Sequence, residues 1–94
     1  MEQDRLFMIR LCSDRAAYEA IPKRRLKLDI QGLKNILESR GDCEIALWTP
    51  QFMVFKWKSD IEVTIVDDGK MIIRNVETEE DAARIAETIV SLRS

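Results

Sequence analysis

The stretch that decides the fold is residues 61–94, which read IEVTIVDDGKMIIRNVETEEDAARIAETIVSLRS. At its start, Val63 and Ile65 alternate with polar neighbours, which is the period of a strand with one buried face. The following Asp-Asp-Gly-Lys sequence is a strong hairpin signal, because Gly69 can adopt a positive φ without steric cost. A returning strand is therefore expected over residues 71–76, which are rich in β-branched side chains.

A helix is expected to follow this hairpin and to begin at Thr78. The Thr78 hydroxyl can accept a bond from the backbone N–H of Asp81, and the acidic first turn suits the positive end of the helix dipole. The apolar residues of this segment recur at helical spacing and predict one buried stripe. The stripe consists of Ala82, Ile85, Ala86, Ile89 and Leu92.

The upstream chain is expected to supply further sheet and one more helix. Asp29 is a good N-cap residue and Gly41 a good C-terminal stop, which predicts a helix between them. Residues 14–22 are interpreted as a loop that has room for one short helix ended by Pro22. Alternating apolar residues predict the remaining strands over residues 6–12, 42–49 and 52–58.

These elements predict one α+β domain that spans residues 1–94. Their order is strand, helix, four strands, helix. We expect a five-stranded, mostly antiparallel sheet with both helices on one face. The opposite face is then either bare or covered by a partner.

The composition excludes several classes of protein. The formal net charge is −2, which offers no overall attraction to nucleic acid. The chain has no apolar run of the length that a membrane span needs and no signal-peptide pattern, so a cytoplasmic location is expected. Cys12 and Cys43 are far apart and the chain has no histidine, which argues against a zinc site. A disulfide between them is not expected in the reducing cytoplasm. The abundance of Glu, Lys and Arg over Asn and Gln is typical of heat-adapted proteins.

The predicted order and several short motifs resemble a single repeat of the TATA-box-binding protein family. The hairpin around Gly69-Lys70-Met71 and the Thr-Glu-Glu helix start after it are similar to the last hairpin and helix of such a repeat. Residues 27–30, which read Lys-Leu-Asp-Ile, resemble the start of the family's first helix, and Pro50 matches a proline before the third strand. The resemblance extends over residues 7–90 and implies a single-repeat fold of that type, in a small protein expected to come from an archaeal or thermophilic source.

The chain departs from that family where the family reads DNA. The family has two repeats in one chain, and its helix-free face inserts phenylalanines into the minor groove. This chain has one repeat, and the position that matches the wedge is Val66. Ile72 and Arg74 stand where the family has Val and Thr. We therefore do not expect TATA recognition.

The helix-free face is the candidate functional surface. Strand alternation assigns to it Met8, Arg10, Glu44, Ala46, Trp48, Val54, Lys56, Lys58, Glu62, Thr64, Val66, Ile72 and Arg74. This mixture of apolar and charged residues suits a protein interface, and an unremarkable solvated face is the simpler alternative. The candidate interaction residues are Met8, Arg10, Trp48, Val54, Lys56, Lys58, Val66, Ile72 and Arg74.

We predict a non-enzymatic interaction module that binds a protein partner or a second copy of itself. A homodimer would restore the two-repeat arrangement and cover a sheet edge. The alternative is a nucleic-acid-binding protein that uses Arg10, Lys56, Lys58 and Arg74, assisted by the basic run over residues 23–25.

No catalytic, metal or cofactor site is expected. The chain lacks a histidine for general base work and a glycine-rich phosphate loop. Cys43 is the one nucleophile candidate, but it has no histidine partner. A metal site at Asp67 and Asp68 is conceivable, yet a hairpin turn explains both residues.

Overall fold

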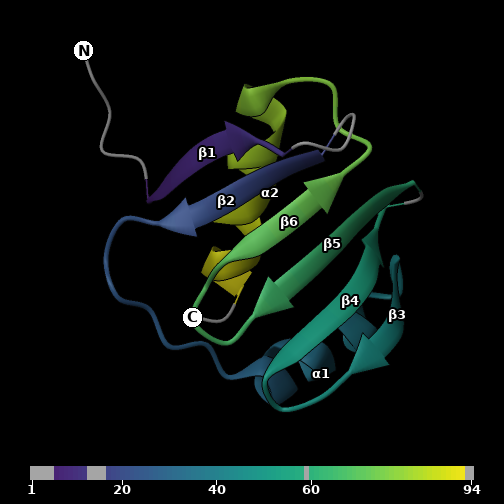
Figure 1. Ribbon diagram of the computed structural model, residues 1–94. Coiled ribbons are helices and arrows are strands. Elements are labelled where there is room, and N and C mark those ends of the chain that lie inside the picture. Colours follow the sequence, from purple (N-terminus) through teal and green to yellow (C-terminus); the bar gives the residue numbers. More distant parts are fainter. Residues whose placement is uncertain (1–5, 13–16, 59, 93–94) are drawn as a thin grey trace.

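The computed structural model describes residues 6–12, 17–58 and 60–92, and within them six strands and two helices form one α+β unit (Figure 1). All strand pairings are antiparallel, and the order across the sheet is β1-β2-β6-β5-β4-β3. The strands are β1 Phe7–Leu11, β2 Ala17–Pro22, β3 Cys43–Trp48, β4 Phe52–Trp57, β5 Ile61–Val66 and β6 Met71–Arg74.

Both α1 (Ile30–Arg40) and α2 (Glu79–Leu92) lie on the same side of this sheet, as Figure 1 shows. The first covers β3 and β4, and the second covers β1 and β2. One hydrophobic core fills the space between helices and sheet. Its fully buried members include Leu33 and Leu37 of α1, Ile89 of α2, and Phe55 and Ile65 of the sheet. Within the described residues, no helix lies on the opposite face of the sheet.

The hairpin and the start of α2 have the predicted geometry. Gly69 has φ +96° at the turn between β5 and β6, and the Lys70 N–H donates to Asp68 Oδ1 at 3.0 Å. The Asp81 N–H donates to the Thr78 hydroxyl at 3.0 Å, which confirms Thr78 as the N-cap. These local bonds hold the turn between β5 and β6 and the first turn of α2.

The two ends of α1 differ from one another. Gly41 ends this helix with φ +84°, as predicted. Asp29 precedes it in extended conformation, but its side chain makes no capping hydrogen bond. A β-carbon added at Gly32 would lie only 2.6 Å from Asp29 Oδ2, so the Asp29 carboxylate lies against the first turn of the helix.

The prediction of five strands was wrong, because part of the segment taken as a loop forms β2. Within the predicted loop, residues 14–16 lie outside the described part of the chain, and Ala17–Pro22 pair with β1 on one side and β6 on the other. Three of the first four residues, Ala17, Glu19 and Ala20, have low intrinsic strand preference. Pairing on both edges and complete burial of Ala17 and Ala20 override that preference.

A β-bulge in β3 changes the second half of that strand. Ile45 is opposite Phe55 of β4, and Leu47 is opposite Val54, so Ala46 is an extra residue in the ladder. The alternation of side chains therefore changes faces after Ala46.

Candidate interaction surface

On the helix-free face, a row of side chains with alternating charge runs across the strands from β3 to β6. Register places Glu44 of β3 opposite Lys56 of β4, Lys56 opposite Glu62 of β5, and Glu62 opposite Arg74 of β6. Cross-strand neighbours of opposite sign stabilise a sheet and largely cancel each other's charge. The face is consequently less basic than a count of its cations implies.

A second row on the same face is mainly apolar. Leu47 of β3 is opposite Val54 of β4, which is opposite Thr64 of β5, which is opposite Ile72 of β6. Leu47 is exposed, and the other three are half-buried. This apolar row beside a charged row is a composition that protein interfaces share.

Seven of the nine predicted surface residues lie on this face. The seven are Met8, Arg10, Val54, Lys56, Val66, Ile72 and Arg74. The guanidinium of Arg10 is not available as an unpaired cation, because its Nε donates to Glu19 Oε1 on β2 at 3.1 Å.

Trp48 was assigned to the wrong face. Because of the bulge at Ala46, Trp48 is opposite the fully buried Met53 and packs against the core on the helix side. Lys34 of α1 places its Nζ 5.4 Å from the centroid of the Trp48 ring. The indole Nε1 is buried and has no hydrogen-bond partner within the described residues. Leu47 takes the place on the helix-free face that the prediction gave to Trp48.

Lys58 also lies elsewhere than predicted. β4 ends at Trp57, and Lys58 leaves the strand with φ +50°. Its Nζ lies 5.4 Å from the centroid of the Trp57 ring, as does the guanidinium carbon of Arg40. Trp57 is buried on the helix side, so Lys58 contributes a cation–π contact at the end of the sheet.

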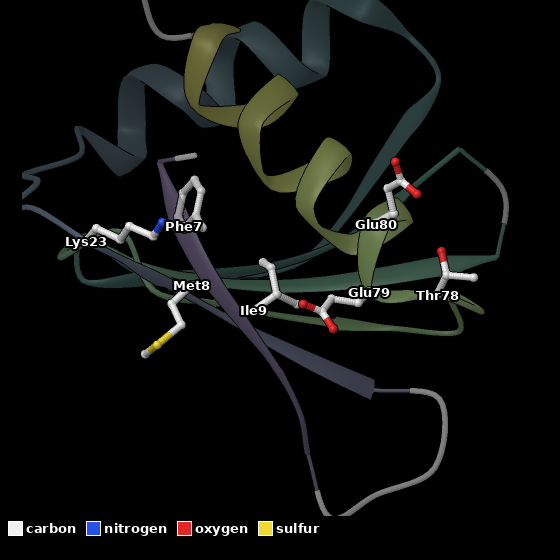
Figure 2. Close-up of a pocket in the computed structure, with 7 residues that line it drawn as sticks. All are labelled: Phe7, Met8, Ile9, Lys23, Thr78, Glu79 and Glu80. Atoms are coloured by element: carbon white, nitrogen blue, oxygen red, sulfur yellow. The ribbon is translucent and has the colours of Figure 1, made fainter. Parts of the chain in front are cut away.

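The outer edge of β1 borders a groove of about 610 Å³. Phe7, Met8 and Ile9 line it on the strand side, and Glu79 and Glu80 line it on the side of α2. Figure 2 shows Phe7 and Ile9 pointing toward α2, whereas Met8 points to the other side of the sheet. Because consecutive residues of β1 line the groove, it runs beside the edge of this strand.

Exposed apolar side chains gather at this edge. In the described part of the chain, the exposed large apolar residues are Leu6, Met8, Leu11 and Leu47, and the first three belong to β1 or directly precede it. Register places Leu11 on the helix side, but its side chain is 64% exposed because it lies at the end of an edge strand. The alternation of side chains in a sequence does not show which strand lies at the edge of the sheet.

The two cysteines lie at opposite edges of the sheet and are both unbonded. Cys12 follows β1, and Cys43 begins β3. The Cys43 thiol donates to Asp42 Oδ1 at 3.5 Å. Burial raises the pKa of the Cys43 thiol, and the hydrogen bond to Asp42 and the Asp42 charge raise it further. Cys43 is thus held as the protonated thiol, which is a poor nucleophile.

Alkylation measures this property directly. In a Cys12→Ser variant at pH 8, iodoacetamide should modify Cys43 several-fold more slowly in the folded protein than in urea, because a raised pKa leaves less thiolate. An Asp42→Asn substitution should increase the folded-state rate by removing the neighbouring charge. Equal rates in the folded and unfolded protein would contradict a raised pKa of the Cys43 thiol.

The described residues offer neither a metal-binding cluster nor a membrane-spanning helix. They contain no group of three or more Cys, Asp or Glu side chains with the geometry to hold a metal ion. Neither helix of that part of the chain is long and apolar enough to cross a membrane. At the hairpin, the Asp68 carboxylate accepts from the backbone of Lys70, and the Asp67 carbonyl accepts from the Leu28 N–H at 2.8 Å.

No family model, curated protein or solved structure matches this chain. On this chain the outer edge of β1 adjoins the helix-free face of the sheet.

Proposed function

We propose that this protein is a non-enzymatic interaction module that pairs with a second copy of itself through the outer edge of β1. The observation that carries the proposal is an edge strand with exposed apolar side chains and outward-facing backbone groups. Such an edge is a template for another strand.

The hydrogen bonds of β1 identify which backbone groups face outward. The Lys23 N–H donates to the Leu6 carbonyl, and the Cys12 N–H donates to the Ala17 carbonyl, each at 2.9 Å. In an antiparallel ladder only alternate residues bond to a given neighbour. The even-numbered residues of β1 therefore face β2, and the N–H and C=O groups of the odd-numbered Phe7, Ile9 and Leu11 point to the outer edge.

The two outer edges of the sheet differ. β3 contains the bulge at Ala46 and is followed by Pro50, and both features hinder the addition of another strand. β1 pairs with β2 over five consecutive residues without a register shift. Edge pairing is therefore expected at β1 and not at β3.

A two-fold axis through Ile9 gives a self-complementary register. Ile9 would then be opposite its own counterpart, and Leu11 would be opposite the partner's Phe7, which buries an exposed leucine. On the helix-free side, Met8 would be opposite the partner's Arg10. The two sheets would join into one, with a helix-free face extending over both copies.

This arrangement also fits the resemblance noted in the sequence. Apart from β1, the elements β2-α1-β3-β4-β5-β6-α2 follow the order strand, helix, four strands, helix. We infer a single repeat of the TATA-box-binding-protein type, in which pairing of two chains replaces the second repeat. Nucleic-acid binding through the helix-free face is less well supported, because its cations alternate with carboxylates.

Sedimentation equilibrium tests the proposal. The wild-type chain should sediment at twice its 10.9 kDa mass. A Leu11→Lys substitution should shift the equilibrium to monomer, because pairing at the edge would bring a charge against apolar neighbours. The substituted side chain is 64% exposed in the single chain, so folding should be retained.

Leu47→Lys is the matched control. Leu47 is 50% exposed on the opposite outer strand, and the variant changes the net charge by the same amount. It should sediment as the wild type does. A wild-type chain that stays at 10.9 kDa at high concentration, or equal dissociation in both variants, would refute pairing at β1.

A further inference from the structure

A basic cleft lies between the β2–α1 loop and the β5–β6 turn, with a volume of about 830 Å³. It shares Lys23 with the groove beside β1, but its other lining residues lie outside that groove. The cations that line it are Lys23, Arg24, Arg25, Lys27 and Lys70, and the carboxylate that lines it is Asp68.

The loop that supplies these cations is held on the hairpin. The Leu28 side chain is buried, and its N–H donates to the Asp67 carbonyl at 2.8 Å. Leu26 packs so closely on Gly69 that a β-carbon added there would lie 2.8 Å from Leu26 Cδ1. At the other end of the loop, the Lys23 N–H donates to the Leu6 carbonyl. Leu26 and Leu28 are anchored inward, whereas the neighbouring cations at positions 23, 24, 25 and 27 are exposed.

Among the described residues, few carboxylates compensate the charges in this cleft. Lys70 Nζ lies 3.8 Å from Glu19 Oε2, but no described carboxylate lies within ion-pair distance of Lys23, Arg24, Arg25 or Lys27. Asp68 accepts a hydrogen bond from the Lys70 backbone. A local excess of positive charge thus stands on a chain whose net charge is −2.

We infer that this cleft binds the phosphate groups of a nucleic-acid duplex without reading its sequence. Four of the five cations fall within five consecutive residues, which suits the dense charge of a duplex backbone. Arginine's planar guanidinium pairs well with phosphate oxygens. The lining includes no aromatic side chain on which an unpaired base could stack, which favours a duplex over a single strand.

Fluorescence anisotropy with a labelled mixed-sequence DNA duplex tests this inference. Binding should weaken linearly on a log–log plot as salt rises from about 50 to about 200 mM. In the triple variant Arg24→Ser/Arg25→Ser/Lys27→Ser, the slope should become shallower by about 2.7, because each phosphate contact contributes roughly 0.9. Changing the duplex sequence should have no effect.

The matched control is Lys56→Ser/Lys58→Ser/Arg84→Ser, which removes the same charge outside both the cleft and β1. Its slope should stay close to that of the wild type. The inference fails if the duplex does not bind at low salt, or if both triple variants lose affinity equally. It fails too if the protein binds phosphatidylserine vesicles or a polyglutamate peptide but not the duplex. Sedimentation of the same variants measures pairing at β1 separately, so a failure of duplex binding can be distinguished from a failure of pairing.

Discussion

Replacing Gly69 by alanine is expected to lower the free energy of unfolding by about 2–5 kcal/mol. Gly69 has φ +96°, and forcing an L-residue into this left-handed region costs about 1–2 kcal/mol. The new β-carbon would also lie 2.8 Å from both Leu26 Cδ1 and Pro22 Cγ. Relieving this overlap costs about 1–3 kcal/mol more, because the loop must move away from the turn. Urea unfolding followed by tryptophan fluorescence measures the change.

Gly41→Ala separates the two contributions. Gly41 has φ +84°, but no atom lies within 4 Å of an added β-carbon. This variant should lose only the backbone share, about 1–2 kcal/mol. If Gly69→Ala and Gly41→Ala destabilise the protein equally, the loop does not pack on Gly69 as described. All variants are compared at one protein concentration, because pairing would make stability depend on it.

The second large effect is expected at Phe55. Truncating this fully buried side chain of β4 to alanine should cost about 3–5 kcal/mol, because it removes apolar contacts and leaves a cavity. The same urea titration measures the loss. Val54→Ala, one residue away, should cost about 1 kcal/mol or less, because Val54 points to the helix-free face. A larger loss at Val54 than at Phe55 would mean that the faces of β4 are reversed.

The sequence predicted the elements whose signals are local. The alternation in β5, the positive φ of Gly69 and Gly41, and the Thr78 cap each involve a few neighbouring residues, and each is confirmed. The two helices and their common side of the sheet also followed from apolar stripes that need a single core.

The elements that were missed depend on contacts between distant segments. Ala17 and Ala20 do not favour a strand by themselves, and β2 forms because β1 and β6 bond to it from both sides. The bulge at Ala46 changes which residues of β3 face the helices, and alternation along one strand cannot reveal it.

The candidate surfaces were predicted only in part, again because they depend on contacts between distant segments. Seven of the nine proposed residues lie on the helix-free face. Trp48 packs against the core on the helix side, and Lys58 lies at the end of the sheet over the Trp57 ring. Lys27 and Lys70 join one basic cleft only because the loop before α1 folds over the β5–β6 turn. The basic run itself was visible in the sequence, but its hairpin partner was not.

The irregular ladder at Ala46 has a consequence for the size of any assembly. A sheet with two open sides can add chains without limit and grow into a filament. Here the edge at β3 is kinked by the bulge, so a chain can pair only through its edge at β1. Once two chains have paired, neither has a regular edge left. Assembly would then stop at a closed pair, and restoring a regular ladder by deleting Ala46 would be the change most prone to produce fibres.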